Sequence, residues 1–346
     1  VCDLKNNYEF ITECNVDEEE YYSYIEKIES GIFFSEQVTE LIENDDKPLN
    51  INVKSIDLNK YTRKKQIGEG AFGVVYEVEN KLNKIIYAAK VSKSEIYESV
   101  KKDRETVNLI REVTILSKIN HPSIMKFIGF SPINFKNVPK PVIITELLKN
   151  GTLEDVIELE RKGLSNNLWN ETKKLINIYG IASSMAYLHS LDILHRDLKP
   201  ANILVDDYLF PKLADFGLSK DQMCKSEECK QVNPTGLIGT PMYISPEIYN
   251  QNNYTKACDV YAFAFIVYEI MTSEVPLIGS NRYQVMWNIM KGIRPSFSFE
   301  IPKCYKNLIE RCWDMDPNKR PSFDDIVYDL KNDPEFITDL VEEGEF

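Results

Sequence analysis

The sequence lacks a long apolar run. No stretch of about 18 uncharged apolar residues occurs in the 346 residues, so we expect no segment that inserts into a membrane. The most apolar stretch, from Val260 to Tyr268, ends at Glu269 and predicts a buried helix of a protein core. The content of 43% hydrophobic and 27% charged residues is otherwise ordinary for a globular protein.

An excess of positive charge is also lacking, since the formal net charge is −13. Fourteen acidic and two basic residues lie in residues 1–46, so the remaining 300 residues carry a net charge of −1. This balance argues against binding of nucleic acid or of an anionic membrane through a global field. It does not argue against binding of a nucleotide, because the acidic residues are concentrated in the N-terminal segment.

Cysteines are few and scattered. The seven cysteines lie at positions 2, 14, 224, 229, 258, 304 and 312, an odd set that favours reduced thiols and a cytoplasmic location over a disulfide framework. Cys224 and Cys229 leave a metal or redox pair open, although four residues separate them and no histidine is near. Two separate thiols in a loop are the simpler interpretation. The chain begins at Val1 without a signal-peptide pattern, so we expect a fragment or a trimmed product.

Residues 1–50 are predicted to form an acidic helical extension. Between residues 17 and 44 the apolar spacing predicts two amphipathic helices broken at Gly31. The apolar positions are Tyr21, Tyr24, Ile25 and Ile28 in the first helix and Val38, Leu41 and Ile42 in the second. Two interpretations stay open. The helices are either a solvated hairpin that remains from an upstream module, or a module that docks a partner or inhibits the rest of the chain.

Four polar residues stand at fixed offsets in the stretch from Ile193 to Gly217, namely Asp197, Lys199, Asn202 and Asp215. Apolar runs flank them, so we expect short strands to present the polar groups at their ends. A carboxylate can position a hydroxyl, while an amide oxygen and a second carboxylate hold a divalent metal. An ammonium group neutralises a migrating phosphoryl group, so this set suits phosphoryl transfer.

Three glycines, Gly68, Gly70 and Gly73, lie between runs of β-branched residues. A G-x-G-x-x-G pattern alone is weak, because dinucleotide-binding folds use it before a helix. Strand residues follow here, which predicts a hairpin tip whose backbone N–H groups can approach phosphates closely. Lys90 stands in an apolar strand run 17 residues after Gly73, where a charge is costly unless it is paired. Glu112, in a predicted helix from 109 to 119, is the candidate partner.

These motifs resemble those of eukaryotic protein kinases, with HRDLKPAN at 195–202 and DFG at 215–217. The pattern continues through a segment from Gly239 to Glu247 that resembles a peptide-docking segment. The resemblance covers about residues 61–332. It implies an α+β, bilobal protein kinase fold, with a small β-rich N-lobe and a larger helical C-lobe. An acidic helical extension at 1–50 precedes this domain, and an acidic tail at 333–346 follows it.

The resemblance implies an enzyme that uses ATP and Mg²⁺. The implied catalytic residues are Asp197, Lys199, Lys90 and Glu112, and the implied metal-binding residues are Asn202 and Asp215. The implied ATP-binding residues, among which Thr145 is the gatekeeper, are Ile67, Gly68, Glu69, Gly70, Ala71, Phe72, Gly73, Val75, Ala88, Lys90, Thr145, Glu146, Leu148 and Leu204. Phosphorylated Thr235 would pair with Arg196, and this pair would control activity, with Ser226 and Ser219 as the weaker candidates for the phosphorylated residue.

The resemblance also implies a hydrophobic spine and an ion pair. The spine would run through Leu116, Phe127, His195 and Phe216 to Asp259. Arg320 would pair with Glu247, a buried type of pair whose loss leaves an uncompensated charge.

The class of substrate rests on smaller signs. The run from Lys199 to Asn202 resembles the serine/threonine version of the loop, whereas the Cys-Trp and Arg-Pro-Ser-Phe motifs near Trp313 and Arg320 resemble tyrosine kinases. The mixture resembles the tyrosine-kinase-like group, which mostly phosphorylates Ser and Thr in proteins, and dual specificity stays open. A pseudokinase that acts as a binding scaffold would lack a catalytic residue, and none is missing. A small-molecule kinase is disfavoured by the docking segment.

Overall fold

The computed structural model describes residues 16–39, 55–70, 73–93, 104–221, 241–251, 254–276, 278–298 and 300–337. Three of the predicted site residues, Ala71, Phe72 and Thr235, lie outside these ranges. Most of the segment between Leu218 and Thr240 also lies outside them.

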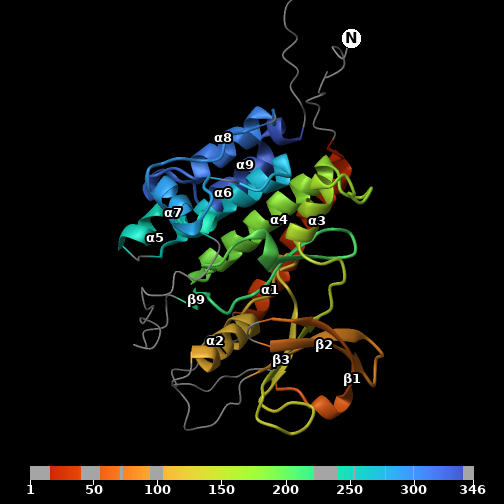
Figure 1. The fold of residues 1–346 in the computed structure, drawn as a ribbon. Helices are drawn as coiled ribbons and strands as arrows, with labels where there is room; N and C mark the ends of the chain where they lie inside the picture. The colour runs from red at the N-terminus through yellow and green to blue at the C-terminus, as the bar shows by residue number, and fades with distance from the viewer. Residues whose placement is uncertain are drawn as a thin grey trace, which may run out of the picture.

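The smaller lobe contains a five-stranded antiparallel sheet with the strand order β1-β2-β3-β5-β4. Its strands are β1 (Tyr61–Glu69), β2 (Gly73–Asn80), β3 (Ile86–Ser92), β4 (Phe127–Ser131) and β5 (Val142–Glu146). β1 and β2 form a hairpin, with Gly68 opposite Val75, so the glycine-rich segment lies at a hairpin tip as predicted. Helix α2 (Arg104–Lys118) lies beside this sheet (Figure 1).

The larger lobe is helical and occupies the upper part of Figure 1. Its helices are α3 (Leu153–Arg161), α4 (Glu171–Ser190), α5 (Pro246–Gln251), α6 (Lys256–Thr272), α7 (Arg282–Met290), α8 (Lys303–Cys312) and α9 (Phe323–Asn332). α6 is buried at every position from Cys258 to Thr272, because α4 and α8 cover it, and this confirms the predicted core helix. Within the described ranges, no helix has both the length and the hydrophobicity that crossing a bilayer requires.

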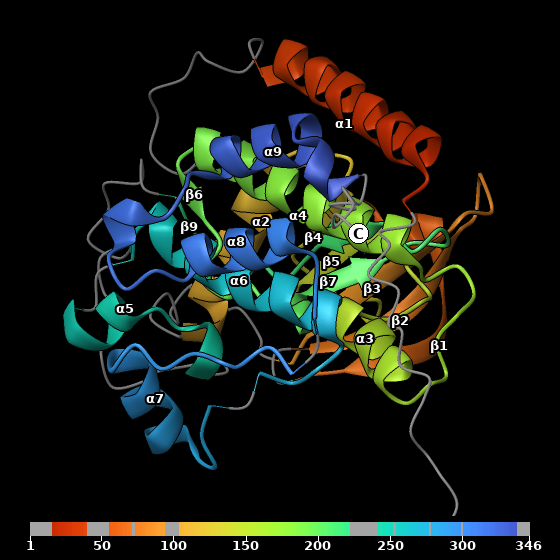
Figure 2. The same ribbon diagram turned by 90° about the horizontal axis from the view of Figure 1, so that it is seen from above.

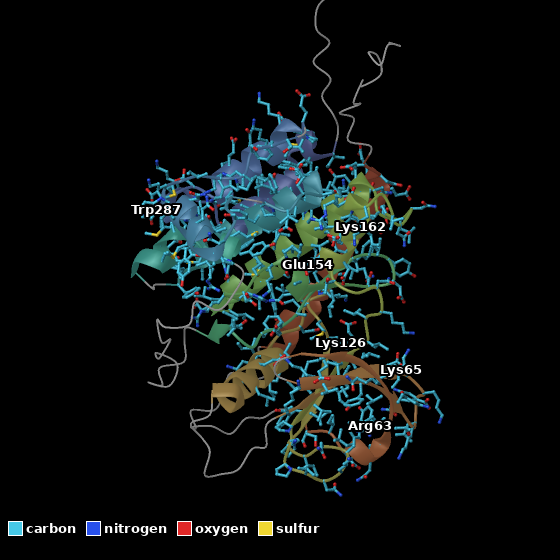
Figure 3. All side chains as sticks on the ribbon, viewed as in Figure 1. Arg63, Lys65, Lys126, Glu154, Lys162 and Trp287 are labelled. Carbon is cyan, nitrogen blue, oxygen red and sulfur yellow. The ribbon has the colours of Figure 1, made fainter. Side chains whose placement is uncertain are left out.

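Two short antiparallel sheets lie between the lobes and carry the polar motif. β6 (Ile193–Leu194) pairs with β9 (Lys220–Asp221), and β7 (Ile203–Val205) pairs with β8 (Pro211–Leu213). The predicted short strands that present the polar residues are therefore confirmed. Figure 3 places the labelled Arg63 and Lys65 on the sheet lobe and Trp287 and Lys162 on the helical lobe. The described elements form the α+β bilobal arrangement that the sequence predicts.

The N-terminal extension differs from the prediction. It forms one helix, α1 (Glu18–Thr39), which continues through Gly31, so the predicted break at this residue is wrong. A glycine lowers the stability of a helix by only about 1 kcal/mol, and burial of an apolar helix face contributes more than this. Tyr21, Tyr24, Ile25 and Ile28 are at most 5% exposed, because they face the helical lobe. Figure 2 shows α1 along the outside of that lobe, beside α4 and α9, so the interpretation as a solvated hairpin is also wrong.

Candidate active site

Asp197 lies between β6 and β7, in contact with two other polar side chains of the motif. Asp197 Oδ2 accepts hydrogen bonds from Lys199 Nζ and from Asn202 Nδ2, both at 2.8 Å. Asn202 Nδ2 also donates to the carbonyl oxygen of Asp197 at 2.7 Å. A short 3-10 turn, Pro200–Asn202, sets the spacing between the three residues. The structure therefore brings a carboxylate, an ammonium and an amide into direct contact at one point.

Asp259 on α6 holds this segment from the side of the helical lobe. Asp259 Oδ2 accepts a hydrogen bond from the backbone N–H of His195 at 3.0 Å and lies 2.9 Å from His189 Nε2. Its Oδ1 accepts from the backbone N–H of Arg196 at 2.9 Å. Arg196 has a φ of 69°, a left-handed conformation that is costly for a residue with a side chain. These hydrogen bonds hold the strained backbone next to Asp197.

The charge state of Asp259 suits this role. Burial alone would raise the pKa of its carboxyl group, but the hydrogen bond with His189 and the nearby His195 lower the pKa below its ordinary value. Asp259 is therefore ionised near neutral pH and accepts hydrogen bonds with both oxygens.

Asp215 follows β8, with a left-handed φ of 58°. Its Oδ1 accepts a hydrogen bond from Gly217 N at 3.3 Å. Among the described residues, no group of three or more His, Cys, Asp or Glu side chains is placed to enclose a metal ion. Mg²⁺ needs no such group, because it is usually held by one or two carboxylates together with phosphate oxygens and water. Asp215 and the amide oxygen of Asn202 therefore fit a magnesium nucleotide.

Lys90 and Glu112 form an ion pair between β3 and α2. Lys90 Nζ donates to both carboxylate oxygens of Glu112 at 2.9 Å. Burial alone would lower the pKa of Lys90, but attraction to Glu112 and Asp215 outweighs burial and raises the pKa above its ordinary value. Lys90 is therefore charged, and it lies within the electrostatic field of the candidate metal-binding carboxylate.

The other residues expected to bind ATP come from both lobes. β1 and the residue after it carry Ile67, Gly68, Glu69 and Gly70; β2 carries Gly73 and Val75; β3 carries Ala88; β5 carries Thr145 and Glu146; Leu148 follows β5; and β7 carries Leu204. Gly70 N donates to Gly73 O at 2.9 Å, which closes the hairpin tip. A Cβ atom at Gly73 would lie 2.7 Å from Val91 O, so only glycine fits at this position.

Glu146 ends β5 at the connection between the lobes. Its Oε1 accepts a hydrogen bond from Lys126 N at 2.8 Å and lies 3.8 Å from Lys212 Nζ. Figure 3 shows Lys126 at the level where the two lobes meet. The side chain of Glu146 therefore fastens β5 to its neighbours, and its backbone remains the part expected to contact adenine.

The residues of the expected spine lie in one buried region. The rings of His195 and Phe216 meet edge to face, with centroids 5.4 Å apart, and both side chains are fully buried. Leu116 belongs to the same core cluster as Phe216, and Phe127 packs against that cluster. Asp259 on α6 holds the backbone of His195, and a continuous spine from Leu116 to Phe216 stays a prediction.

The described part of the docking segment, from Pro241 onward, is fixed by two polar contacts. Arg320 donates to both carboxylate oxygens of Glu247, at 2.7 and 2.9 Å, which is the expected ion pair. Tyr243 OH donates to Glu269 on α6, a contact that our sequence analysis missed. A glutamate in an otherwise apolar helix was the available signal, since a buried carboxyl group needs a partner.

Glu269 predicts a pH dependence of stability. Burial, with a smaller contribution from Glu154, raises the pKa of Glu269 to about 8, despite the hydrogen bond from Tyr243. Between the ordinary value of 4.5 and about 8, the folded state holds a proton that the unfolded state releases. The free energy of unfolding should therefore fall as pH rises through this window, by up to about 1.4 kcal/mol per pH unit.

Urea unfolding at a series of pH values measures this slope. Glu269→Gln should flatten the slope, and Glu310→Gln, at an exposed position of α8, should leave it unchanged. A Glu269→Gln profile parallel to that of the wild type would show that Glu269 is not the titrating group.

Comparisons with known proteins agree with this geometry. A family model for the protein kinase domain matches residues 61–330. A probable LIM domain-containing serine/threonine-protein kinase of Dictyostelium discoideum is 32% identical over 326 residues, which covers 92% of this chain and 47% of that protein. A putative serine/threonine-protein kinase/receptor of Acanthamoeba polyphaga mimivirus is 33% identical over 270 residues, 78% of this chain and 15% of that protein.

A dual specificity protein kinase of Dictyostelium discoideum is 31% identical over 277 residues, 78% of this chain and 40% of that protein. The chain thus spans less than half the length of these relatives. The family model covers most of the chain, including every described residue of the candidate site from Ile67 to Asp215. The chain belongs to the protein kinase family.

Proposed function

We propose that the protein transfers a phosphoryl group from ATP to serine and threonine hydroxyls of other proteins. The observation that carries this proposal is the contact of Asp197 with Lys199 and Asn202, held by Asp259. A noncatalytic scaffold has no need for this arrangement of charged groups or for the strained backbone at Arg196. Membership of the tyrosine-kinase-like group is part of the same proposal.

In the mechanism that we propose, the chain orients the reactants and balances charge. Mg²⁺·ATP, when bound, would supply the phosphoryl group, and Asn202 and Asp215 would hold its metal ion. Asp197 accepts a hydrogen bond from the substrate hydroxyl and so aims its oxygen. The aspartate need not be a strong base, because in a loose transition state the proton leaves late. Lys199 and Lys90 each place an ammonium group near the phosphate oxygens.

Several relatives bear the name serine/threonine-protein kinase, which supports serine and threonine as acceptors. One relative is named a dual specificity kinase, so phosphorylation of tyrosine as well is the second candidate. We also propose a cytoplasmic location, which the scattered cysteines favour.

An assay with radiolabelled ATP and a generic basic protein tests the proposal, followed by separation of phosphoserine, phosphothreonine and phosphotyrosine. We expect label on serine and threonine, and none with Asp197→Asn. Label on tyrosine as well would favour the dual specificity candidate. No incorporation with either Mg²⁺ or Mn²⁺ would favour a binding scaffold.

We further propose control by phosphorylation of Thr235, which lies outside the described residues. Arg196 directly precedes Asp197, and its guanidinium group lies 4.2 Å from the centre of the Tyr254 ring. A phosphate on Thr235 would bring nearly two negative charges and oxygens that match a guanidinium group. Thr235→Ala and Arg196→Ala should each lower the activity about tenfold, and the double variant should be little worse than either.

Initial rates of the two single variants and the double variant measure the coupling between these residues. Ser226→Ala, nine positions before Thr235, serves as the matched control and should retain the wild-type rate. Losses that add up in the double variant would mean that the two residues act independently, and the switch would be wrong.

A further inference from the structure

Tyr24 of α1 reaches into the junction of three elements of the kinase fold. Its hydroxyl lies 2.8 Å from Ser123 Oγ, in the loop between α2 and β4, and its ring packs on Phe210 with centroids 4.7 Å apart. Tyr24 is 5% exposed and Ser123 is 1% exposed, so the contact is shielded from water. Burial also raises the pKa of Tyr24 above its ordinary value, so the phenol remains protonated.

Gly180, which has no side chain, leaves room for the hydroxyl group of Tyr24. Gly180 lies in the middle of α4, where glycine is unfavourable by about 1 kcal/mol relative to alanine. A Cβ atom at Gly180 would lie 2.3 Å from Tyr24 OH, 2.6 Å from Pro211 Cγ and 3.1 Å from Ser123 Oγ. α1, α4, β8 and the α2–β4 loop therefore meet at Gly180, where a side chain would not fit.

Ser123 connects this junction to the candidate active site. Its carbonyl oxygen accepts a hydrogen bond from Leu213 N at 2.8 Å, and Leu213 O accepts from Met125 N at 2.9 Å. Leu213 is the last residue of β8, two positions before Asp215. On its other side, the loop continues from α2, which carries Glu112. One short segment thus connects the partner of Lys90 to the strand that places the candidate metal ligand.

His121 fixes the same loop to α4. Its Nδ1 accepts a hydrogen bond from Ser123 N at 3.0 Å, and its Nε2 lies 3.2 Å from Ser183 Oγ. Burial, together with the charge of Lys212, lowers the pKa of His121 to about 3, so the ring is neutral and Nε2 carries the proton that it donates to Ser183. The loop is therefore held by α4 at His121 and by α1 at Ser123.

α1 is itself anchored on the helical lobe. Tyr21 OH donates to Leu330 O on α9 at 2.8 Å, and the backbone N–H of Asp17 donates to Thr172 Oγ1 at 2.6 Å. Lys173 pairs with Glu20, and Lys331 pairs with Glu29. These contacts lie before and after Tyr24 along the chain. They therefore hold the part of α1 that carries Tyr24 against α4 and α9.

We infer that Tyr24 is a positioning residue for phosphotransfer, acting through Ser123 on the α2–β4 loop, which hydrogen-bonds to β8. This inference rests on the proposed kinase activity. α1 lies outside the segment that matches the kinase family, yet it completes the support of the Lys90–Glu112 pair. Loss of the Tyr24 hydroxyl lets the loop shift, and the helix that carries Glu112 then leaves its position more often.

Kinetics of Tyr24→Phe, Ser123→Ala and the double variant in the full chain test this role. Each single change should lower kcat/KM for ATP about fivefold, the factor that one hydrogen bond contributes, and the double variant should also lose about fivefold. Amide hydrogen exchange should speed up in α2 and stay unchanged in α6, because Tyr24→Phe keeps the ring that docks α1. Tyr22→Phe, at a 40% exposed position of the same helix, is the matched control and should behave as the wild type.

The inference would be overturned if Tyr24→Phe showed the same kinetics and the same amide hydrogen exchange as the control Tyr22→Phe. Faster exchange in α2 and α6 alike would also overturn it, because that result means a general loss of stability. If the wild-type chain transfers no phosphate, the proposed function fails, and exchange in α2 together with affinity for a nonhydrolysable ATP analogue decides the role of Tyr24 by itself.

Discussion

Lys90→Met is expected to lower the rate of phosphotransfer by at least about 100-fold. The substitution removes the ammonium group that pairs with Glu112 and interacts with Asp215. Catalysis at such a site depends mainly on the positions of charged groups. Methionine is apolar and similar in length, and the neighbours of Lys90 across the sheet are Val75 and Ile143, so the strand should persist. Initial rates with saturating protein substrate, together with circular dichroism, measure the two expectations.

Lys64→Met provides the matched control, because Lys64 lies in the same sheet and pairs with Glu79 at the surface, where its side chain is 45% exposed. Its rate should stay close to that of the wild type. If Lys90→Met keeps more than about a hundredth of the wild-type activity with its fold intact, Lys90 does not position phosphates, and the assignment of the nucleotide site is wrong.

Arg320→Ala is expected to lower the free energy of unfolding by about 3–5 kcal/mol, the usual cost of removing one partner from a buried ion pair. The Arg320 side chain is fully buried, and it donates to Glu247 and to the carbonyl oxygens of Asp314 and Ala257. The substitution leaves the Glu247 carboxylate and both carbonyl groups without this donor. Urea unfolding followed by circular dichroism measures the loss.

Arg311→Ala is the control for Arg320→Ala. Arg311 pairs with Asp329 at 2.9 Å on the surface, where its side chain is 50% exposed, and such pairs contribute about 0–1 kcal/mol. If both substitutions lowered the free energy of unfolding equally, burial would not determine how much the Arg320–Glu247 pair contributes to stability. A further check is acid titration: Arg320 lowers the pKa of Glu247 against the effect of burial, so the pKa of Glu247 should rise in Arg320→Ala.

The polar part of the site could be predicted from the sequence, because its residues are close together along the chain. Asp197, Lys199 and Asn202 span six positions, and one turn between two short strands brings them into contact. The pairing of Lys90 with Glu112 could be predicted from the sequence for another reason. A lysine in an apolar strand run requires a counter-charge, and Glu112 is the acidic residue of the predicted helix that follows it.

The place of α1 could not be predicted in the same way. The spacing of Tyr21, Tyr24 and Ile28 shows that one face of the helix is apolar, but it does not show which surface covers that face. The covering residues include Gly180 and Phe210, more than 150 positions away, and Ser123, 99 positions from Tyr24, and they are not marked by a local pattern. Gly31 was misleading because its helix penalty is local, whereas the burial that offsets it comes from tertiary packing.

The docking of α1 has a consequence for how the chain folds during synthesis. Tyr21 and its partner Leu330 are separated by 309 positions, so the helix leaves the ribosome long before α9 exists. At about 5–20 residues per second, roughly 15–60 seconds pass before the part of the α1 binding surface that α9 supplies has been made. A nascent chain in that interval exposes tyrosine and isoleucine side chains, which makes it a substrate for chaperones. We expect the acidic residues around that face, among them Glu18, Glu19 and Glu20, to oppose association of neighbouring nascent chains by charge repulsion.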